Sequence, residues 1–186
     1  QGGKWCYAPL PLNINYEISD IIVYYNETIE AKNITDKYGP IEYWDVSSIT
    51  DMSFMLTGYY WFNTDISRWN VSSVTTMSVM FSSSTVFNQP LNSWNVSSVT
   101  DMNFMFSEAT DFNQPLNSWN VSSVTTMTSM FLIAPTFNQP LNSWDVSNVA
   151  GMSSMFASAT AFNQPLNSWD VSNVTDFSYM FNGASN

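Results

Sequence analysis

The chain of 186 residues contains no histidine, a single cysteine (Cys6) and only four basic residues against 15 acidic ones. Without histidine it lacks the commonest general base and the commonest metal ligand. One cysteine cannot form an internal disulfide or a cysteine-rich zinc site. Binding to nucleic acid or to an anionic membrane surface is nearly excluded, because both need clusters of Lys or Arg. We therefore expect no enzyme, no cofactor and no metal site.

Long apolar runs are also missing. No stretch of about 18 apolar residues is present, so we expect no membrane insertion. Hydrophobic residues nevertheless make up 45% of the chain and aromatic residues 16%, which is too apolar for a disordered acidic tail. The sequence opens at Gln1 rather than Met. We interpret this as a mature N-terminus left after removal of a signal peptide, which predicts an extracellular or cell-surface protein.

The dominant feature is an internal repeat of 25 residues that starts at residue 44. The unit at residues 94–118 reads W-N-V-S-S-V-T-D-M-N-F-M-F-S-E-A-T-D-F-N-Q-P-L-N-S. Each unit begins with a tryptophan: Trp44, Trp69, Trp94, Trp119, Trp144 and Trp169. The repeat divides the chain into a non-repeat segment, residues 1–43, expected to cap the repeats or to serve assembly, and a solenoid of five full and one partial repeats, residues 44–186.

The pattern within a unit predicts two elements. Apolar and polar residues alternate over residues 94–97, which indicates a strand. From Met102 to Ala109 apolar residues recur at i, i+3, i+4 and i+7, which indicates a short helix with Thr100 or Asp101 as its N-cap. Pro115 then turns the chain back. The expected fold class is an α/β repeat solenoid, similar to leucine-rich repeats, with one strand and one short helical turn per coil and a non-repeat N-terminal cap.

Like residues of successive coils should stack in columns, about 4.8 Å apart. All 11 methionines fall in two columns, which we interpret with the phenylalanines as core packing. The asparagines at residues 63, 88, 113, 138 and 163 predict a ladder whose amides satisfy backbone groups between coils, with sugar binding as the alternative. The serine column at residues 47, 72, 97, 122, 147 and 172 is expected to be an outward hydroxyl row or a set of turn caps.

Two stretches carry a resemblance to a known family: W-D-V-S-N-V-T-D-F-S-Y-M-F at residues 169–181 and F-N-Q-P-L-N-S-W-D-V-S at residues 137–147. They resemble the BspA-like surface-protein repeat, a relative of leucine-rich repeats found in bacterial surface proteins and lipoproteins and in algal and protist extracellular proteins. The resemblance covers residues 44–186 and extends weakly into 29–43. It implies a secreted or surface-displayed solenoid used in adhesion or surface architecture, and it carries over no catalytic residue. The proline of F-N-Q-P departs from the family, in which Asp or Glu is common at that position.

Sequons for N-linked glycosylation occur at six positions: Asn26, Asn33, Asn70, Asn95, Asn120 and Asn173. We expect N-linked glycans at some of them, because the chain has secretory features. The alternative for the repeat positions is an Asx cap or a polar ladder, since Asp45, Asp145 and Asp170 occupy the same column. The acids do not form a recognisable metal site, although Ca²⁺ binding between Asp145 and Asp170 is left open.

The two ends of the solenoid are candidates for assembly. The sixth unit stops before its F-N-Q-P-L-N-S segment, which predicts that another chain covers its face or that residues are missing from the sequence. Cys6 is expected to form an intermolecular disulfide or to be a buried thiol. The assembly candidates are Ile18, Ile21, Val23 and Tyr25 in the non-repeat segment, and Phe177, Met180 and Phe181 in the sixth unit.

These features predict a secreted structural repeat protein, a glycosylated subunit that stacks head to tail into an extracellular fibre or surface layer. Its expected partners are copies of itself, N-linked glycans and other surface proteins. The alternative is a surface adhesin that uses the solenoid face for protein or glycan ligands. A remote alternative is ice binding through the threonines at residues 50, 75, 100, 125 and 175, a column that Ala150 interrupts.

Overall fold

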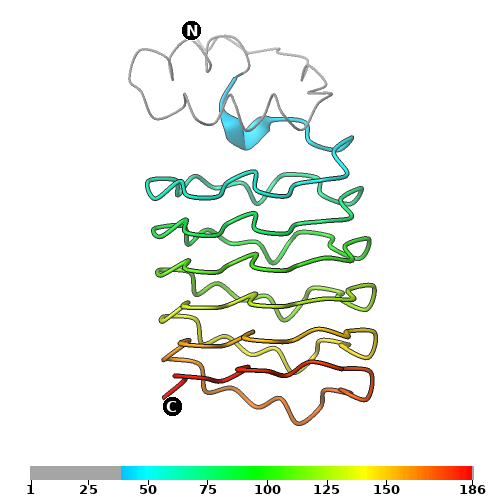
Figure 1. The fold of residues 1–186 in the computed structure, drawn as a ribbon. Coiled ribbons are helices and arrows are strands. Elements are labelled where there is room, and N and C mark those ends of the chain that lie inside the picture. The colour runs from blue at the N-terminus through cyan, green and yellow to red at the C-terminus, as the bar shows by residue number, and fades with distance from the viewer. Residues whose placement is uncertain (1–38, 186) are drawn as a thin grey trace, which may run out of the picture.

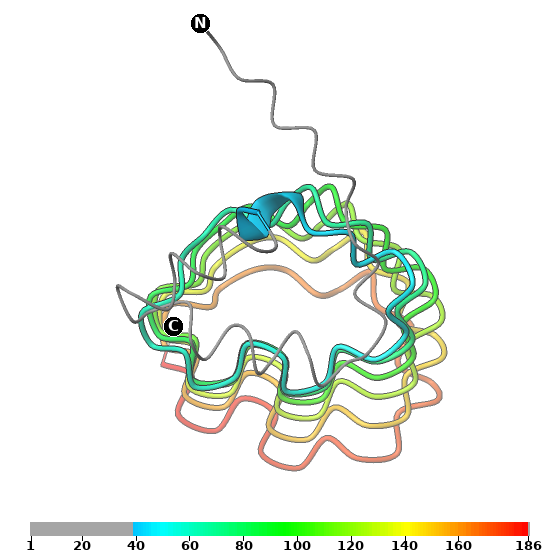
Figure 2. The ribbon, with the colours of Figure 1, turned by 90° about the horizontal axis from the view of Figure 1, so that it is seen from above.

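The computed structural model describes residues 39–185, which wind into a stack of similar coils. The coils lie one below the other from the cyan N-terminal end to the red C-terminal end (Figure 1). Seen along the stack, each coil is a flattened loop around a common interior (Figure 2). Neighbouring coils meet in parallel at one residue per coil, through isolated bridges that join Asp51, Thr76, Asp101, Thr126, Gly151 and Asp176 in order. The solenoid predicted from the repeat is therefore present.

The predicted α/β fold class is wrong. Among residues 39–185 the only helix is the short 3-10 helix η1 (Ile41–Tyr43), which follows the extended Pro40. The strand content of the same residues is limited to the isolated bridges, so these coils form no sheet. No helix in this part of the chain is long and apolar enough to cross a membrane. The coils are built from tight turns instead.

The segment predicted as a helix, residues 102–109, forms successive turns. Met105 N–H donates to the Met102 carbonyl at 3.3 Å, and Ala109 N–H donates to the Phe106 carbonyl at 3.2 Å. Between them, Phe106 N–H points out of the coil and donates to the Met130 carbonyl of the next coil at 2.9 Å. An α-helix needs its N–H groups for bonds within the same segment. Here half of them bond the neighbouring coil, so a helix cannot form.

The segment predicted as a strand shows the expected faces without the expected conformation. Trp94 and Val96 are buried and Asn95 is exposed, as the alternation indicates. However, Trp94 N–H donates to the Leu91 carbonyl at 3.0 Å, and Val99 N–H donates to the Val96 carbonyl at 2.9 Å. Each bond closes a turn across three residues. Because the backbone turns so often, no two consecutive residues pair with the next coil, and no β-ladder forms.

The turns require left-handed backbone at two positions in each coil. The first column has φ between 54° and 62° and consists of Phe54, Val79, Phe104, Ser129, Ser154 and Tyr179. The second has φ between 53° and 74° and consists of Gly58, Ser83, Glu108, Ile133, Ser158 and Gly183. These residues occupy the third position of a four-residue turn, where a type II turn needs positive φ and favours glycine. Most coils place a residue with a side chain there.

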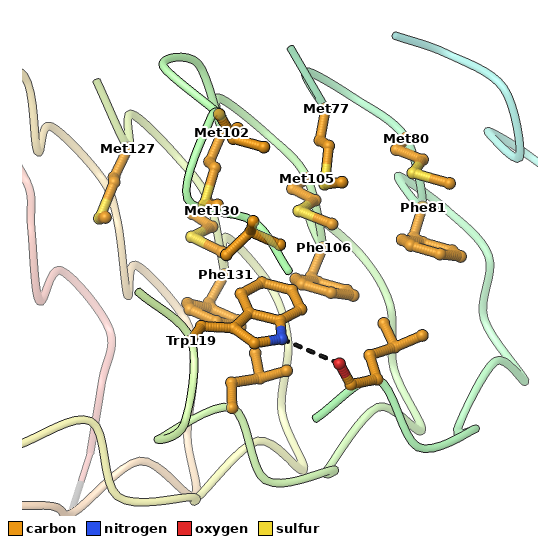
Figure 3. Packing of buried hydrophobic residues seen from close by; sticks show 14 of the residues in the cluster. Met77, Met80, Phe81, Met102, Met105, Phe106, Trp119, Met127, Met130 and Phe131 are labelled. Atoms are coloured by element: carbon orange, nitrogen blue, oxygen red, sulfur yellow. Dashed lines mark hydrogen bonds between the residues drawn. The ribbon is translucent and has the colours of Figure 1, made fainter. Parts of the chain in front are cut away.

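The interior is filled by the predicted columns of methionine and phenylalanine (Figure 3). All 11 methionines are buried, so their interpretation as core is confirmed. Phe106 stacks on Phe112 of its own coil with ring centroids 4.1 Å apart, and on Phe131 of the next coil at 5.6 Å. Phe131 repeats this arrangement with Phe137 at 4.0 Å. The rings thus form a continuous zigzag along the axis of the stack.

From Trp94 onward, the tryptophan that begins each repeat fastens its coil to the preceding one. The buried Trp119 Nε1–H donates to the Leu91 carbonyl, 28 residues earlier, at 2.9 Å (Figure 3). Trp144 and Trp169 form the same bond with Leu116 and Leu141 at 2.9 and 3.0 Å. A buried indole needs such an acceptor. The regular spacing of tryptophan therefore reflects both core packing and coil-to-coil hydrogen bonding.

Candidate functional site

Within residues 39–185 no group of three or more Cys, Asp or Glu side chains is placed to hold a metal ion. In the same residues every buried side-chain nitrogen and oxygen has a hydrogen-bond partner. The regular polar columns are therefore the features that need a functional explanation.

The sequon column forms Asx turns. Asn70 Oδ1 accepts from Ser72 N–H at 3.2 Å and from the Ser72 hydroxyl at 2.8 Å, and Asn120 makes the same two bonds with Ser122. Asn95 Oδ1 accepts from the N–H two residues on, at 3.2 Å. This is the Asx-cap alternative of the sequence analysis, and it explains why serine follows two residues later. The three asparagines are nevertheless exposed.

The remaining sequons differ in position. Asn173 is exposed, but its Nδ2 donates to the Ser147 carbonyl of the preceding coil at 2.7 Å. An N-linked sugar would be attached to Nδ2. In Asn173 this atom already donates a hydrogen bond within the protein. Asn26 and Asn33 lie outside the described residues.

The aspartates of the same column are hydrogen-bonded in the same way. Asp145 Oδ1 accepts from the Ser147 hydroxyl at 2.7 Å and from Ser147 N–H at 3.1 Å, which lowers the pKa of that carboxyl. Ser172 N–H and hydroxyl lower the pKa of Asp170, while the neighbouring Asp145 charge acts against this. Both carboxylates are acceptors in turns, and they form no larger acidic cluster.

The asparagine column forms the predicted ladder between coils. Asn113 N–H donates to Asn88 Oδ1 at 3.0 Å, and Asn138 N–H donates to Asn113 Oδ1 at 3.0 Å. The next residue adds a second bond, since Gln139 Nε2 donates to Asn113 Oδ1 at 3.1 Å. The side chains are half-buried rather than fully buried. Each amide oxygen thus joins two donors of the following coil.

The threonine column is also used between coils. The Thr100 hydroxyl donates to the Thr75 carbonyl at 3.1 Å, and the Thr125 hydroxyl donates to the Thr100 carbonyl at 3.1 Å. Ser98 and Ser123 bond the preceding coil in the same way. The sequence raised ligand binding as a role for this column of surface hydroxyls. In the structure, these hydroxyls already donate to carbonyls of the preceding coil.

The coil face at residues 162–185 contains a hollow. It encloses an open volume of about 310 Å³, lined by Phe162, Asn163, Gln164, Leu166, Phe181 and Ala184. Phe181 is 49% exposed, whereas Phe156, its counterpart one coil earlier, is fully buried. Phe177 is 43% exposed where Met152 is fully buried. We call this surface the terminal face.

Three of the assembly candidates lie within the described residues. Phe177 and Phe181 lie on the terminal face, and Met180 is buried with 7% exposure. Ile18, Ile21, Val23, Tyr25 and Cys6 lie outside the described residues. Asn163 also lines this face, which the sequence patterns did not predict. Its place in the 25-residue column next to the sixth unit is the signal that identifies it.

These coils define a solenoid of tight turns held together by polar ladders. Two overlapping stretches, residues 26–135 and 115–186, match the family described as "Mycoplasma protein of unknown function, DUF285". The chain belongs to this family, which is a BspA-like surface repeat family. The match does not extend to leucine-rich repeats. No curated protein and no solved structure matches the chain.

Proposed function

We propose that this chain is an extracellular structural repeat protein whose solenoids stack end to end into a fibre or surface layer. The observation that carries the proposal is the use of the polar columns. Amide oxygens, hydroxyls and indole N–H groups, which would otherwise recognise a ligand, bond one coil to the next. Such a molecule is organised to add coil upon coil rather than to perform chemistry.

N-linked glycans belong to the same proposal. Asn70, Asn95 and Asn120 are exposed, and their Asx turns occupy Oδ1 without using Nδ2 in a bond to a neighbouring coil. Sugars on these residues would project from one side of the stack. They would solvate a surface that has few charges and leave the coil faces uncovered for stacking.

Electron microscopy and sedimentation of the purified chain test the proposal. Over a rising concentration series we expect rods that lengthen along the solenoid axis, with a matching increase in sedimentation coefficient. A monodisperse monomer at high concentration would contradict it. Comparing material before and after enzymatic deglycosylation by intact mass tests the glycan part separately.

A binding module is a second candidate, favoured by two exposed aromatic residues, one just before the first coil and one within it. Tyr43 and Tyr60 are well exposed, and the Arg68 guanidinium lies over the Tyr43 ring, 5.4 Å from its centroid. Later coils carry small or polar residues at these positions. A glycan array probed with the chain and with Tyr60→Ser tests this candidate: specific signals that the substitution abolishes would support it.

A further inference from the structure

A row of apolar side chains runs along one side of the first three coils. Phe54, Val79 and Phe104 occupy the same position in successive coils, and the two phenylalanines are 59% and 38% exposed. Met102 and Met105, in the same turn as Phe104, are buried, so the phenylalanine projects from the side of the stack. We call Phe54, Val79 and Phe104 the apolar row.

The backbone at this position is unfavourable for bulky side chains. In the apolar row φ is 61°, 62° and 54°, a region that is strained for an L-residue and rarely holds a large or β-branched one. Later coils place Ser129 and Ser154 there, with φ of 55° and 54°, so the fold does not require an apolar residue. Strained residues gather at ligand sites, and exposed apolar patches mark interaction surfaces.

The spacing of the two rings indicates what kind of ligand fits the row. Phe54 and Phe104 are two coils apart, roughly 10 Å, with the smaller Val79 between them. In a β-1,4-linked polysaccharide every second sugar presents the same face, and this repeat is close to the same length. The C–H face of a sugar ring packs well on an aromatic ring, whose own face is electron-rich. Alternate sugars of such a chain therefore match the two phenylalanines.

The charges beside the row select a neutral polysaccharide. Asp101 and Glu108 lie in the same coil as Phe104, and no Lys or Arg occurs from residue 69 onward. Asn103 N–H donates to Asp101 Oδ1, and the Ser83 hydroxyl donates to Glu108 Oε2, both at 2.9 Å. The second oxygen of each carboxylate can accept from sugar hydroxyls. An anionic polysaccharide would be repelled here.

We infer that the apolar row binds a neutral β-1,4-linked polysaccharide that lies along the axis of the stack. Phe54 and Phe104 pack on alternate sugars, Val79 contacts the sugar between them, and the two carboxylates accept hydrogen bonds from hydroxyl groups. This contact attaches the side of the stack to a polysaccharide matrix. It goes beyond the proposed assembly and does not depend on it.

Depletion of the chain from solution by insoluble polysaccharides tests the inference. Cellulose and chitin are the two neutral β-1,4-linked probes, and α-linked amylose and anionic polygalacturonate are the comparison probes. The chain is used below any concentration at which it sediments alone. We expect binding to cellulose, chitin or both, and at least roughly tenfold weaker binding to amylose and polygalacturonate.

Serine substitutions identify the surface that is bound. The double variant Phe54→Ser, Phe104→Ser introduces the residue that this position already holds at Ser129 and Ser154, so we expect it to fold. It should bind roughly tenfold more weakly or worse, because both stacking contacts are lost. Phe104→Tyr keeps the ring and should retain binding.

Ile133→Ser is the matched control for these variants. Ile133 is also apolar, 42% exposed and left-handed, but it lies in the other turn column, where Ser83 and Ser158 occur. Its substitution should leave binding unchanged. A loss of binding equal to that of the double variant would mean that exposed apolar residues act without regard to the row, and it would overturn the inference.

Calorimetry with soluble oligosaccharides tests the spacing. Cellotetraose is long enough to contact both phenylalanines, whereas cellobiose reaches only one, so we expect roughly tenfold tighter binding or more for the longer sugar. Equal affinities, unchanged binding by the double variant, or no preference for β-1,4 linkage would each overturn the inference. A double variant that loses only side-by-side association of the chain would assign the row to a second copy instead. None of these results affects end-to-end assembly, which microscopy and sedimentation test separately.

Discussion

At the residue scale, the left-handed turn positions are the least favourable feature of this sequence. Ile133 has φ of 53°, a conformation that costs an L-residue roughly 1–2 kcal/mol and suits a β-branched side chain poorly. Gly58 and Gly183 occupy the same column with φ of 73° and 74°. We expect Ile133→Gly to be more stable than Ile133→Ala by about 1 kcal/mol in the free energy of unfolding. Its urea midpoint should be correspondingly higher.

The alanine variant serves as the control because both substitutions remove the same exposed side chain. They differ only in backbone freedom, part of which glycine returns to the unfolded state. Equal stabilities of the two variants, measured by urea denaturation, would show that the left-handed position carries no strain.

The aspartates of the Asx column make stability depend on pH. The pKa values of Asp145 and Asp170 are lowered by their bonds with Ser147 and Ser172. Their contribution is therefore present above the unfolded pKa of about 3.9, and it is lost as the pH falls through the lower folded values. We expect Asp145→Asn, Asp170→Asn to lose less stability than the unmodified chain between about pH 5 and pH 2.

Asparagine suits this comparison because the column already contains it. Asn120 makes the same turn with Ser122 through an oxygen that does not titrate in this range. Urea denaturation midpoints recorded across the pH range provide the measurement. Parallel curves for the two proteins would assign acid sensitivity to other carboxylates.

At the scale of the element, the coil is stabilised by bonds to its neighbours more than by bonds within itself. Asn113→Ala removes the oxygen that accepts from Asn138 N–H and Gln139 Nε2. The half-buried N–H of Asn138 then loses its partner, so we expect a loss of about 1–2 kcal/mol in the free energy of unfolding. Calorimetry or urea denaturation measures the change.

Asn92→Ala is the matched control for this ladder. Asn92 is exposed, and its side chain makes no hydrogen bond with any described residue, so the substitution should alter stability by less than about 0.5 kcal/mol. A loss as large as that of Asn113→Ala would mean that asparagine contributes through turn conformation rather than through the ladder.

The coil also shows where sequence reasoning succeeds and where it fails. The buried face of residues 94–97 was predicted correctly, because side-chain polarity reports burial whichever turns the backbone makes. The helix at residues 102–109 was predicted wrongly, since its apolar spacing fits a run of turns as well as it fits a helix. Phe104 and Glu108 are left-handed there, and neither residue type signals positive φ.

At the scale of the whole molecule, the coils are interchangeable units. Removal of residues 94–118 deletes one full repeat and keeps every column in register, so we expect a folded, cooperative protein with a smaller denaturant m-value. Removal of residues 94–105 deletes only part of a repeat and shifts the later coils out of register. Met and Phe positions would then stack on polar positions, so we expect the loss of cooperative unfolding. Far-ultraviolet circular dichroism during urea denaturation distinguishes the two deletions.

The sequence predicts this architecture well because one period imposes it. The columns of tryptophan, methionine, phenylalanine and asparagine follow from counting residues. The row of backbone N–H groups that bonds the next coil, at Met127, Ser129, Phe131 and Ile133, does not, because backbone N–H groups have no residue-type signature. Their direction depends on which alternate residues turn outward, and that information is contained only in the folded coil.

The orientation of the ladders also determines how the solenoid responds to force. The bonds between coils run along the axis of the stack, so tension applied at the two ends loads the interfaces in series. Each interface then bears the full load alone, and coils should detach one at a time rather than together. A released coil of 25 residues can extend to roughly 80–90 Å. Under tension along its axis, we therefore expect the stack of coils to lengthen in discrete steps.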